Sequence, residues 1–162
     1  MTSRAKKKNQ PAANDRSRGR VLLIVDQDQA SYVAALEARG IEVVGVTSST
    51  AALVSLQKSR PNVVVANPSA RGLRVGELAK MLAQTEDGIP LLLAGVERAT
   101  IDNRRTALIS GAFDYFELPL EFDLLVERTD QLVALRQKID RLRAEADLDY
   151  LTGLANRRRI QS

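Results

Sequence analysis

The sequence contains no cysteine, no histidine and no tryptophan, and aromatic residues make up only 4% of its 162 residues. Without Cys or His, this chain has no disulfides, no thiolate chemistry, no Cys/His zinc site, and no acid–base catalysis or phosphotransfer by histidine. The absence of Cys is typical of a cytoplasmic protein, which is the location we expect. Because 44% of the residues are hydrophobic, the core must be built from aliphatic side chains.

The chain also has no apolar run near the roughly 18 residues that a membrane span needs, so we expect no membrane span. Its net charge of +4 is unevenly distributed: residues 1–20 hold seven Lys or Arg and one Asp, and the remaining 142 residues carry a net −2. We therefore interpret residues 1–19 as a disordered basic leader. A weak contact of this leader with nucleic acid or anionic lipid is the alternative. No recognition helix accompanies it, so we do not expect nucleic acid to be a partner.

Short apolar runs alternate with helix-like segments between residues 20 and 120. The predicted strands are 21–25, 41–46, 62–66, 90–94 and 113–118, and the predicted helices between them are 30–40, 48–60, 75–88 and 99–112. Strict alternation with short loops indicates right-handed crossovers and a parallel sheet that is covered on both faces. We predict an α/β, flavodoxin-like, doubly wound five-stranded sheet of order 2-1-3-4-5. No glycine-rich loop follows the first strand, which argues against nucleotide binding.

The segment 121–149 contains no Gly or Pro and shows a heptad repeat. Leucine, isoleucine and alanine recur every seven residues, with a second interleaved set, and charged residues cover the other faces. The pattern predicts a last domain helix that continues as a coiled-coil stalk over 121–148. The proposed dimer seam consists of Leu132, Leu135, Ile139 and Leu142. The alternative is a helix packed wholly on its own domain.

Three features of residues 20–120 occur together: the acids Asp26 and Asp28 after the first strand, the polar Asn67 after the third, and the segment "GAFDYFELP" leading to a Leu-Pro step. With these features, residues 20–120 resemble the receiver domain of two-component response regulators. Tyr115 matches the aromatic switch position of that family. For Asp26 and Asp28, the simpler interpretation is a solvated strand end, with Asp28 as a helix cap.

The resemblance also implies that the phosphorylation site is degenerate. Of the paired acids that bind the metal, the chain keeps Asp26 and has Gln27 in the second position. The remaining positions of the site are Asn67 for the phosphoacceptor Asp, Gly95 for the Thr or Ser, and Leu118 for the Lys. An amide is a poor nucleophile and a poor ligand for Mg²⁺, and an aliphatic side chain cannot neutralise a phosphoryl group. We expect a pseudo-receiver that does not accept phosphate, with no catalytic residue and no bound metal.

The last residues contain the pattern Asp-x-Leu-Thr-Gly-Leu-x-Asn-Arg-Arg, formed by Asp149, Leu151, Thr152, Gly153, Leu154, Asn156, Arg157 and Arg158. This pattern resembles the opening of the diguanylate cyclase (GGDEF) domain. Gly153 would allow a tight turn off the stalk, and Thr152 or Asn156 would cap a following helix. We therefore expect residues 149–162 to begin a GGDEF domain that this chain does not complete.

Together these resemblances imply the input module of a cyclase that makes cyclic di-GMP from two GTP. The chain itself is then no enzyme and holds no cofactor, while the parent cyclase would use Mg²⁺ and GTP. Dimerisation through the stalk, and through the receiver face, would set the geometry of the two catalytic halves. The alternative is a stand-alone adaptor. It would bind a signalling protein through the face formed by the helix at 99–112, the strand at 113–118 and the helix that follows.

Overall fold

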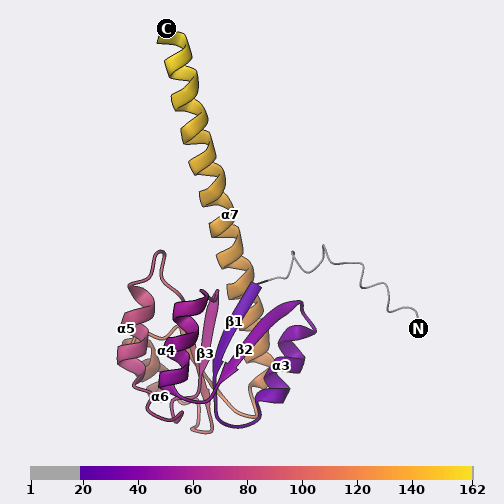
Figure 1. The fold of residues 1–162 in the computed structure, drawn as a ribbon. Helices are drawn as coiled ribbons and strands as arrows, with labels where there is room; N and C mark the ends of the chain where they lie inside the picture. The colour runs from indigo at the N-terminus through magenta and orange to yellow at the C-terminus, as the bar shows by residue number, and fades with distance from the viewer. Residues whose placement is uncertain (1–18, 162) are drawn as a thin grey trace, which may run out of the picture.

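The computed structural model describes residues 19–161, and it describes side chains for residues 19–153. Strands and helices alternate, and the last helix projects far beyond the globular part (Figure 1). The elements in chain order are β1 (Gly19–Ile24), α3 (Gln29–Glu37), β2 (Ile41–Val46), α4 (Ser49–Lys58), β3 (Val63–Ala66), α5 (Val75–Ala83), β4 (Leu91–Gly95), α6 (Ile101–Ile109), β5 (Asp114–Glu117) and α7 (Phe122–Gln161).

The five strands form one parallel sheet in the order β2-β1-β3-β4-β5, which confirms the predicted fold class. Helices α3 and α7 cover one face of the sheet, and α4, α5 and α6 cover the other. Every residue of β3 and β4 is buried. Central strands with both faces covered need apolar side chains on both faces, which explains why these strands appear in the sequence as continuous apolar runs.

Two of the helices begin at a residue whose side chain caps the helix. The Ser48 hydroxyl accepts a hydrogen bond from the Ala51 N–H at 3.2 Å and caps α4. The Thr100 hydroxyl accepts one from the Asn103 N–H at 3.1 Å and caps α6. Such caps satisfy amide groups that have no partner within the helix.

Two local predictions are wrong. Asp28 occupies the position before α3, but its side chain makes no capping hydrogen bond and its backbone is left-handed, with φ of 58°. Helix α5 ends at Ala83 rather than near residue 88. Asp87 and Gly88 adopt φ values of 66° and 68°, which no α-helix tolerates, and they form a turn before β4.

Helix α7 is continuous over its 40 residues, about 60 Å. It therefore includes residues 122–148 of the segment that was expected to be helical, and also residues 149–161. The expected turn at Gly153 is not present, and Thr152 and Asn156 lie inside the helix rather than at a cap. Leu, Ala and Arg around Gly153 favour helix, and a single internal glycine costs only about 1 kcal/mol.

At the start of the sheet, Gly19 is the first residue of β1, so the expected leader 1–19 overlaps the sheet by one residue.

The heptad residues of α7 do not all face the same surroundings. Leu132 is buried in the core of the domain beside Val133, so it does not belong to an exposed seam. Leu135 and Leu142 are about half exposed, at 51% and 53%. The seam available to a partner helix therefore begins at Leu135.

Across the helices that the structure describes, none combines the length and the apolar character needed to cross a bilayer.

Candidate functional site

The candidate site lies at the edge of the sheet where β1, β3 and β4 end, the edge at which α/β proteins place their ligands. Asn67 follows β3 directly and is partly exposed. Its backbone N–H donates to the Ile24 carbonyl at 2.9 Å, which ties it to the end of β1. Its side-chain Oδ1 accepts from the Ser69 N–H at 2.8 Å. The Asn67 amide thus stabilises the turn through Pro68, as Asx side chains commonly do.

Three of the predicted site residues come together here. A Cβ added to Gly95 would lie 3.3 Å from the Tyr115 hydroxyl oxygen and 3.5 Å from Asn67 Oδ1. The Tyr115 hydroxyl thus lies in the space that a side chain at position 95 would enter. Asn67 after β3, Gly95 at the end of β4 and Tyr115 within β5 thus form one packed cluster.

Tyr115 points into the molecule and is only 5% exposed. Its hydroxyl donates a hydrogen bond of 2.6 Å to the Glu97 carbonyl, in the loop between β4 and α6. Burial, together with the nearby charges of Glu97 and Glu117, raises the pKa of the Tyr115 phenol. The hydroxyl therefore stays a neutral donor, and it joins β5 to the loop that follows β4.

The remaining predicted site residues lie in other surroundings. Asp26 lines a hollow of about 530 Å³ with Thr47, Ser48, Thr50, Arg71 and Gly72. Leu118 lines a separate hollow of about 390 Å³, together with Asp28, Tyr32 and Asp123. Gln27 is exposed. Among the described side chains, no three acidic groups come together to hold a metal ion.

Gln29 also belongs to this edge, although sequence reasoning assigned it no role. Its Nε2 donates to the Val25 carbonyl at 2.7 Å and to the Val46 carbonyl at 2.9 Å, which joins the ends of β1 and β2. A Cβ at Gly45 would lie 2.5 Å from Gln29 Oε1, so the glycine leaves room for this side chain. Gly45 inside a predicted strand was the one available signal, because such glycines often mark a close approach.

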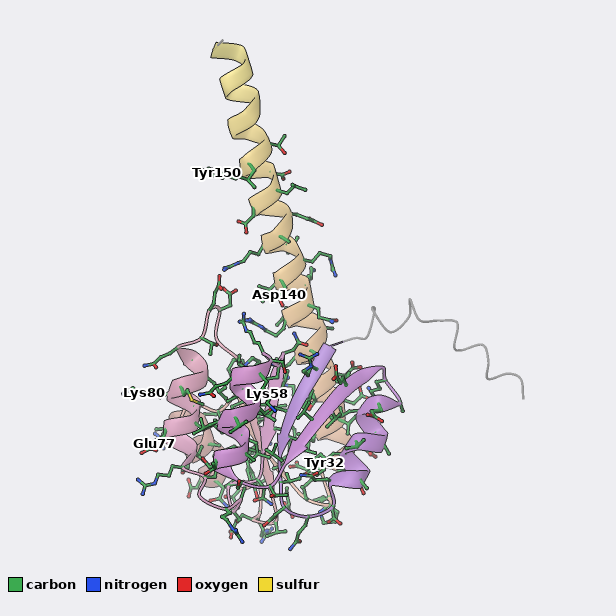
Figure 2. The ribbon with its side chains drawn as sticks, in the orientation of Figure 1. Tyr32, Lys58, Glu77, Lys80, Asp140 and Tyr150 are labelled. Atoms are coloured by element: carbon green, nitrogen blue, oxygen red, sulfur yellow. The ribbon has the colours of Figure 1, made fainter. Side chains whose placement is uncertain are left out.

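Tyr32 of α3 is also buried at this end of the domain, with 4% of its surface exposed (Figure 2). Its ring packs edge-on against Phe122 at the start of α7, with the ring centroids 5.4 Å apart. Burial, with a smaller effect from the Asp28 charge, raises the pKa of Tyr32 to about 12. The pair fixes the first turn of α7 against α3.

The fold is that of response-regulator receiver domains. The receiver domain of the Francisella response regulator 1452 has a TM-score of 0.62 and 22% identity, and it covers 71% of this chain and 96% of its own. The BeF3-activated receiver domain of Klebsiella pneumoniae RstA has a TM-score of 0.61 and 19% identity, and the match covers 70% of this chain and 97% of that domain. The receiver domain of the sensor histidine kinase PA1611 from Pseudomonas aeruginosa has a TM-score of 0.56 and 21% identity over 70% and 98%, and it holds a magnesium ion in its active-site cleft.

No protein-family model matches the sequence, and no curated protein matches it as a relative.

Proposed function

We propose that this chain is a phosphorylation-independent regulatory and dimerisation module of a response-regulator-type diguanylate cyclase. The observation that carries the proposal is a receiver fold whose last helix runs far past the domain into residues 149–161. The residues of this stretch that resemble the cyclase opening include Asp149, Leu151 and Thr152. The chain itself would be a cytoplasmic protein without catalytic activity.

The chemistry of the site supports independence from phosphate. Asn67 offers an amide where an acyl phosphate needs a carboxylate nucleophile. The residues also do not fit Mg²⁺, because the carboxylates of Asp26 and Asp28 line different hollows and Gln27 supplies an amide. Leu118 carries no charge to neutralise a phosphoryl group. This site would therefore not support phosphotransfer.

The Tyr115 cluster supports a domain held in one arrangement. A ligand can shift an equilibrium only by its differential affinity for the two states. Here no phosphate would supply that difference, and the Tyr115 hydroxyl is already bound to the Glu97 carbonyl. We propose that packing keeps the receiver in a state that permits dimerisation, so that the parent cyclase is active without a kinase.

The parent cyclase would carry a GGDEF catalytic domain that uses Mg²⁺ and GTP to make cyclic di-GMP. Two such domains must face each other across a dimer. A long helix with an apolar stripe at Leu135, Ile139 and Leu142 is suited to hold two copies side by side. The signal, where the parent has one, would be a partner that favours one dimer arrangement.

A second candidate is a stand-alone adaptor that binds a signalling protein through the α6–β5–α7 face. One observation favours it: this face exposes large apolar side chains, namely Ile101, Leu108, Ile109, Leu120 and Leu124. Exposed apolar groups that gather on one face often mark interaction sites. The resemblance of residues 149–158 to the cyclase opening favours the first candidate.

The coding sequence after Ser162 separates the two candidates at once, because only a cyclase continues into a Gly-Gly-Asp/Glu-Glu-Phe segment. In the complete protein, cyclic di-GMP formation from GTP and Mg²⁺ should be nearly equal for the wild type and Asn67→Ala. It should be lost when residues 1–120 are deleted and the stalk is kept. A wild type that is inactive alone and active with an added cellular partner would contradict the locked receiver, and would make the domain a protein-binding switch.

A further inference from the structure

A hollow of about 390 Å³ lies where the start of α3 meets the start of α7, and the proposed function assigns it no role. Asp28 and Ser31 line it from the α3 side, and Asp123 lines it from the first turn of α7. The connection between β5 and α7 forms the rest of its wall. A hollow of this size is within the range of small-molecule sites.

The hydroxyl of Tyr32 is the feature that indicates a ligand in this hollow. The Tyr32 side chain lines the hollow and is 4% exposed, yet its hydroxyl makes no hydrogen bond to the part of the chain that the structure describes (Figure 2). A buried phenol normally has a hydrogen-bond partner. The Asp28 charge helps to raise the pKa of Tyr32, which indicates that the phenol lies within reach of that carboxylate.

The two carboxylates of the hollow have no cationic partner. Asp28 and Asp123 are exposed, and neither forms an ion pair or a side-chain hydrogen bond with a described residue. Each lies at the start of a helix, where the helix dipole is equivalent to about half a positive charge. Two such helix ends offset about half of the two negative charges. The remaining charge is about one negative unit, which favours a ligand with a single positive charge.

The rest of the wall is apolar and does not suit a hydrated metal ion. Leu118, Leu120 and Phe122 line it, and Leu120 is 77% exposed. Two carboxylates are also few for a metal centre, and no third acidic side chain among the described residues joins them. A water molecule would satisfy the phenol but would not balance the charge. A cation with an apolar body uses both the charge and the wall.

We propose that this hollow binds a small organic ammonium ion, such as an arylalkylamine. Its ammonium group would lie between Asp28 and Asp123 and would donate a hydrogen bond to the Tyr32 hydroxyl. Its apolar body would cover Leu118 and Leu120. The inference uses only residues between 28 and 123, so it does not rest on the proposed cyclase. Because Asp123 belongs to the first turn of α7, the bound amine would join α3 to the base of the stalk.

The test titrates the ¹⁵N-labelled 162-residue chain with phenethylamine at neutral pH and follows its amide resonances. The resonances of Ser31, Leu120 and Asp123 should shift and saturate, with a Kd of about 1 mM, as expected for so small a ligand. The matched ligand is 2-phenylethanol, which has the same size and shape without the charge. It should bind at least about tenfold more weakly, because it cannot form charge-assisted hydrogen bonds with both carboxylates.

Three variants test the roles of the polar groups. Asp28→Asn and Asp123→Asn should each weaken phenethylamine binding about three- to fivefold, as expected for exposed ion pairs. Tyr32→Phe keeps the ring and removes the hydroxyl, and it should weaken binding about fivefold. Asp102→Asn is the matched control, because Asp102 is an acid in the first turn of α6 that does not line the hollow. This control should bind as the wild type does.

Three results would overturn the inference. The first is the absence of saturable shifts at these three amides in a spectrum of the folded chain. The second is equal binding of 2-phenylethanol and phenethylamine, which would show that the hollow does not recognise the charge. The third is an equal loss for Asp102→Asn and Asp123→Asn, which would show a general attraction of amines to acidic groups of the domain.

Discussion

The hydroxyl oxygen of Tyr115 lies 3.3 Å from the point where a side chain at Gly95 would begin. A contact of that length is tight for a carbon atom, so a methyl group at position 95 requires the tyrosine to move. The hydroxyl is also bound to the Glu97 carbonyl at 2.6 Å. The conformation of Tyr115 and the absence of a side chain at Gly95 are thus two aspects of one packing arrangement.

This relationship predicts that substitutions at the two positions are coupled. Gly95→Ala should be less favourable in the wild type than in Tyr115→Phe, because only the wild type has the hydroxyl in the way. The expected coupling free energy is roughly 0.5–1 kcal/mol. Urea unfolding of the four proteins of this cycle measures it. Additive effects of the two substitutions would show that Tyr115 moves without cost.

The chain should not become phosphorylated with acetyl phosphate and Mg²⁺, as judged by intact mass. Asn67→Asp alone should not restore the reaction, because Gln27 and Leu118 still withhold a metal ligand and a neutralising charge. The matched control adds Gln27→Asp, Gly95→Thr and Leu118→Lys to Asn67→Asp. A hydroxylamine-labile adduct of one phosphoryl group on the wild type would contradict the pseudo-receiver interpretation.

Dimerisation should depend on the stripe of α7 that lies outside the domain. Ile139→Asp and Leu142→Asp each place two like charges in the seam and should shift the chain to monomer, since burying such a side chain contributes roughly 1.5–3 kcal/mol. Leu135 and Ile139 line a groove of about 490 Å³ beside Phe113 of the domain, whereas Leu142 does not line it and is 53% exposed. Replacing Leu142 should therefore leave the domain fold intact. Sedimentation at several concentrations checks this. Equal association of the variants and the wild type would place the dimer contact on the receiver face instead.

Alkaline conditions should destabilise the fold through Tyr32. Its pKa of about 12 in the folded protein exceeds the ordinary value of 10.0, so the folded state favours the protonated phenol. This contribution is fully present below pH 10 and is lost as the pH rises through 12. Its size is on the order of 2–3 kcal/mol. Urea unfolding from pH 8 to 12 should therefore show a smaller loss of stability for Tyr32→Phe than for the wild type. Parallel losses would mean that Tyr32 ionises as readily in the folded state as in the unfolded one.

The sheet could be predicted from the sequence because its signals are local. The run Val63–Ala66 is buried on both faces, and an apolar run that short between a turn and a proline has few other interpretations. The helix ends were less predictable. Helix α5 ends at Ala83, and the left-handed Asp87 in the turn that follows has a conformation that no periodic pattern records.

Contacts between distant parts of the chain could not be predicted. The heptad pattern places Leu132 and Leu135 in the same stripe, but Leu132 packs in the core of its own domain. Helical periodicity shows which face is apolar without showing what covers it. Likewise, Arg143 pairs with Glu86 and Asp87, which lie 57 and 56 positions earlier in the chain. No local signal therefore distinguishes Arg143 from Arg141. The resemblance to receiver domains predicted that Asn67, Gly95 and Tyr115 belong to the site. It did not predict how these three residues pack against one another.

The continuity of α7 turns small movements at its base into large ones at its end. From Arg143, whose guanidinium binds Glu86 and Asp87 in the turn before β4, 18 further residues extend to Gln161, or about 27 Å. A tilt of about 10° at the turn would carry the end of the helix sideways by about 5 Å, close to the rise of one helical turn. The stalk is therefore a lever arm whose pivot is the contact of Arg143 with Glu86 and Asp87. A change too small to disturb the core could bring two domains attached to the stalks into alignment or separate them.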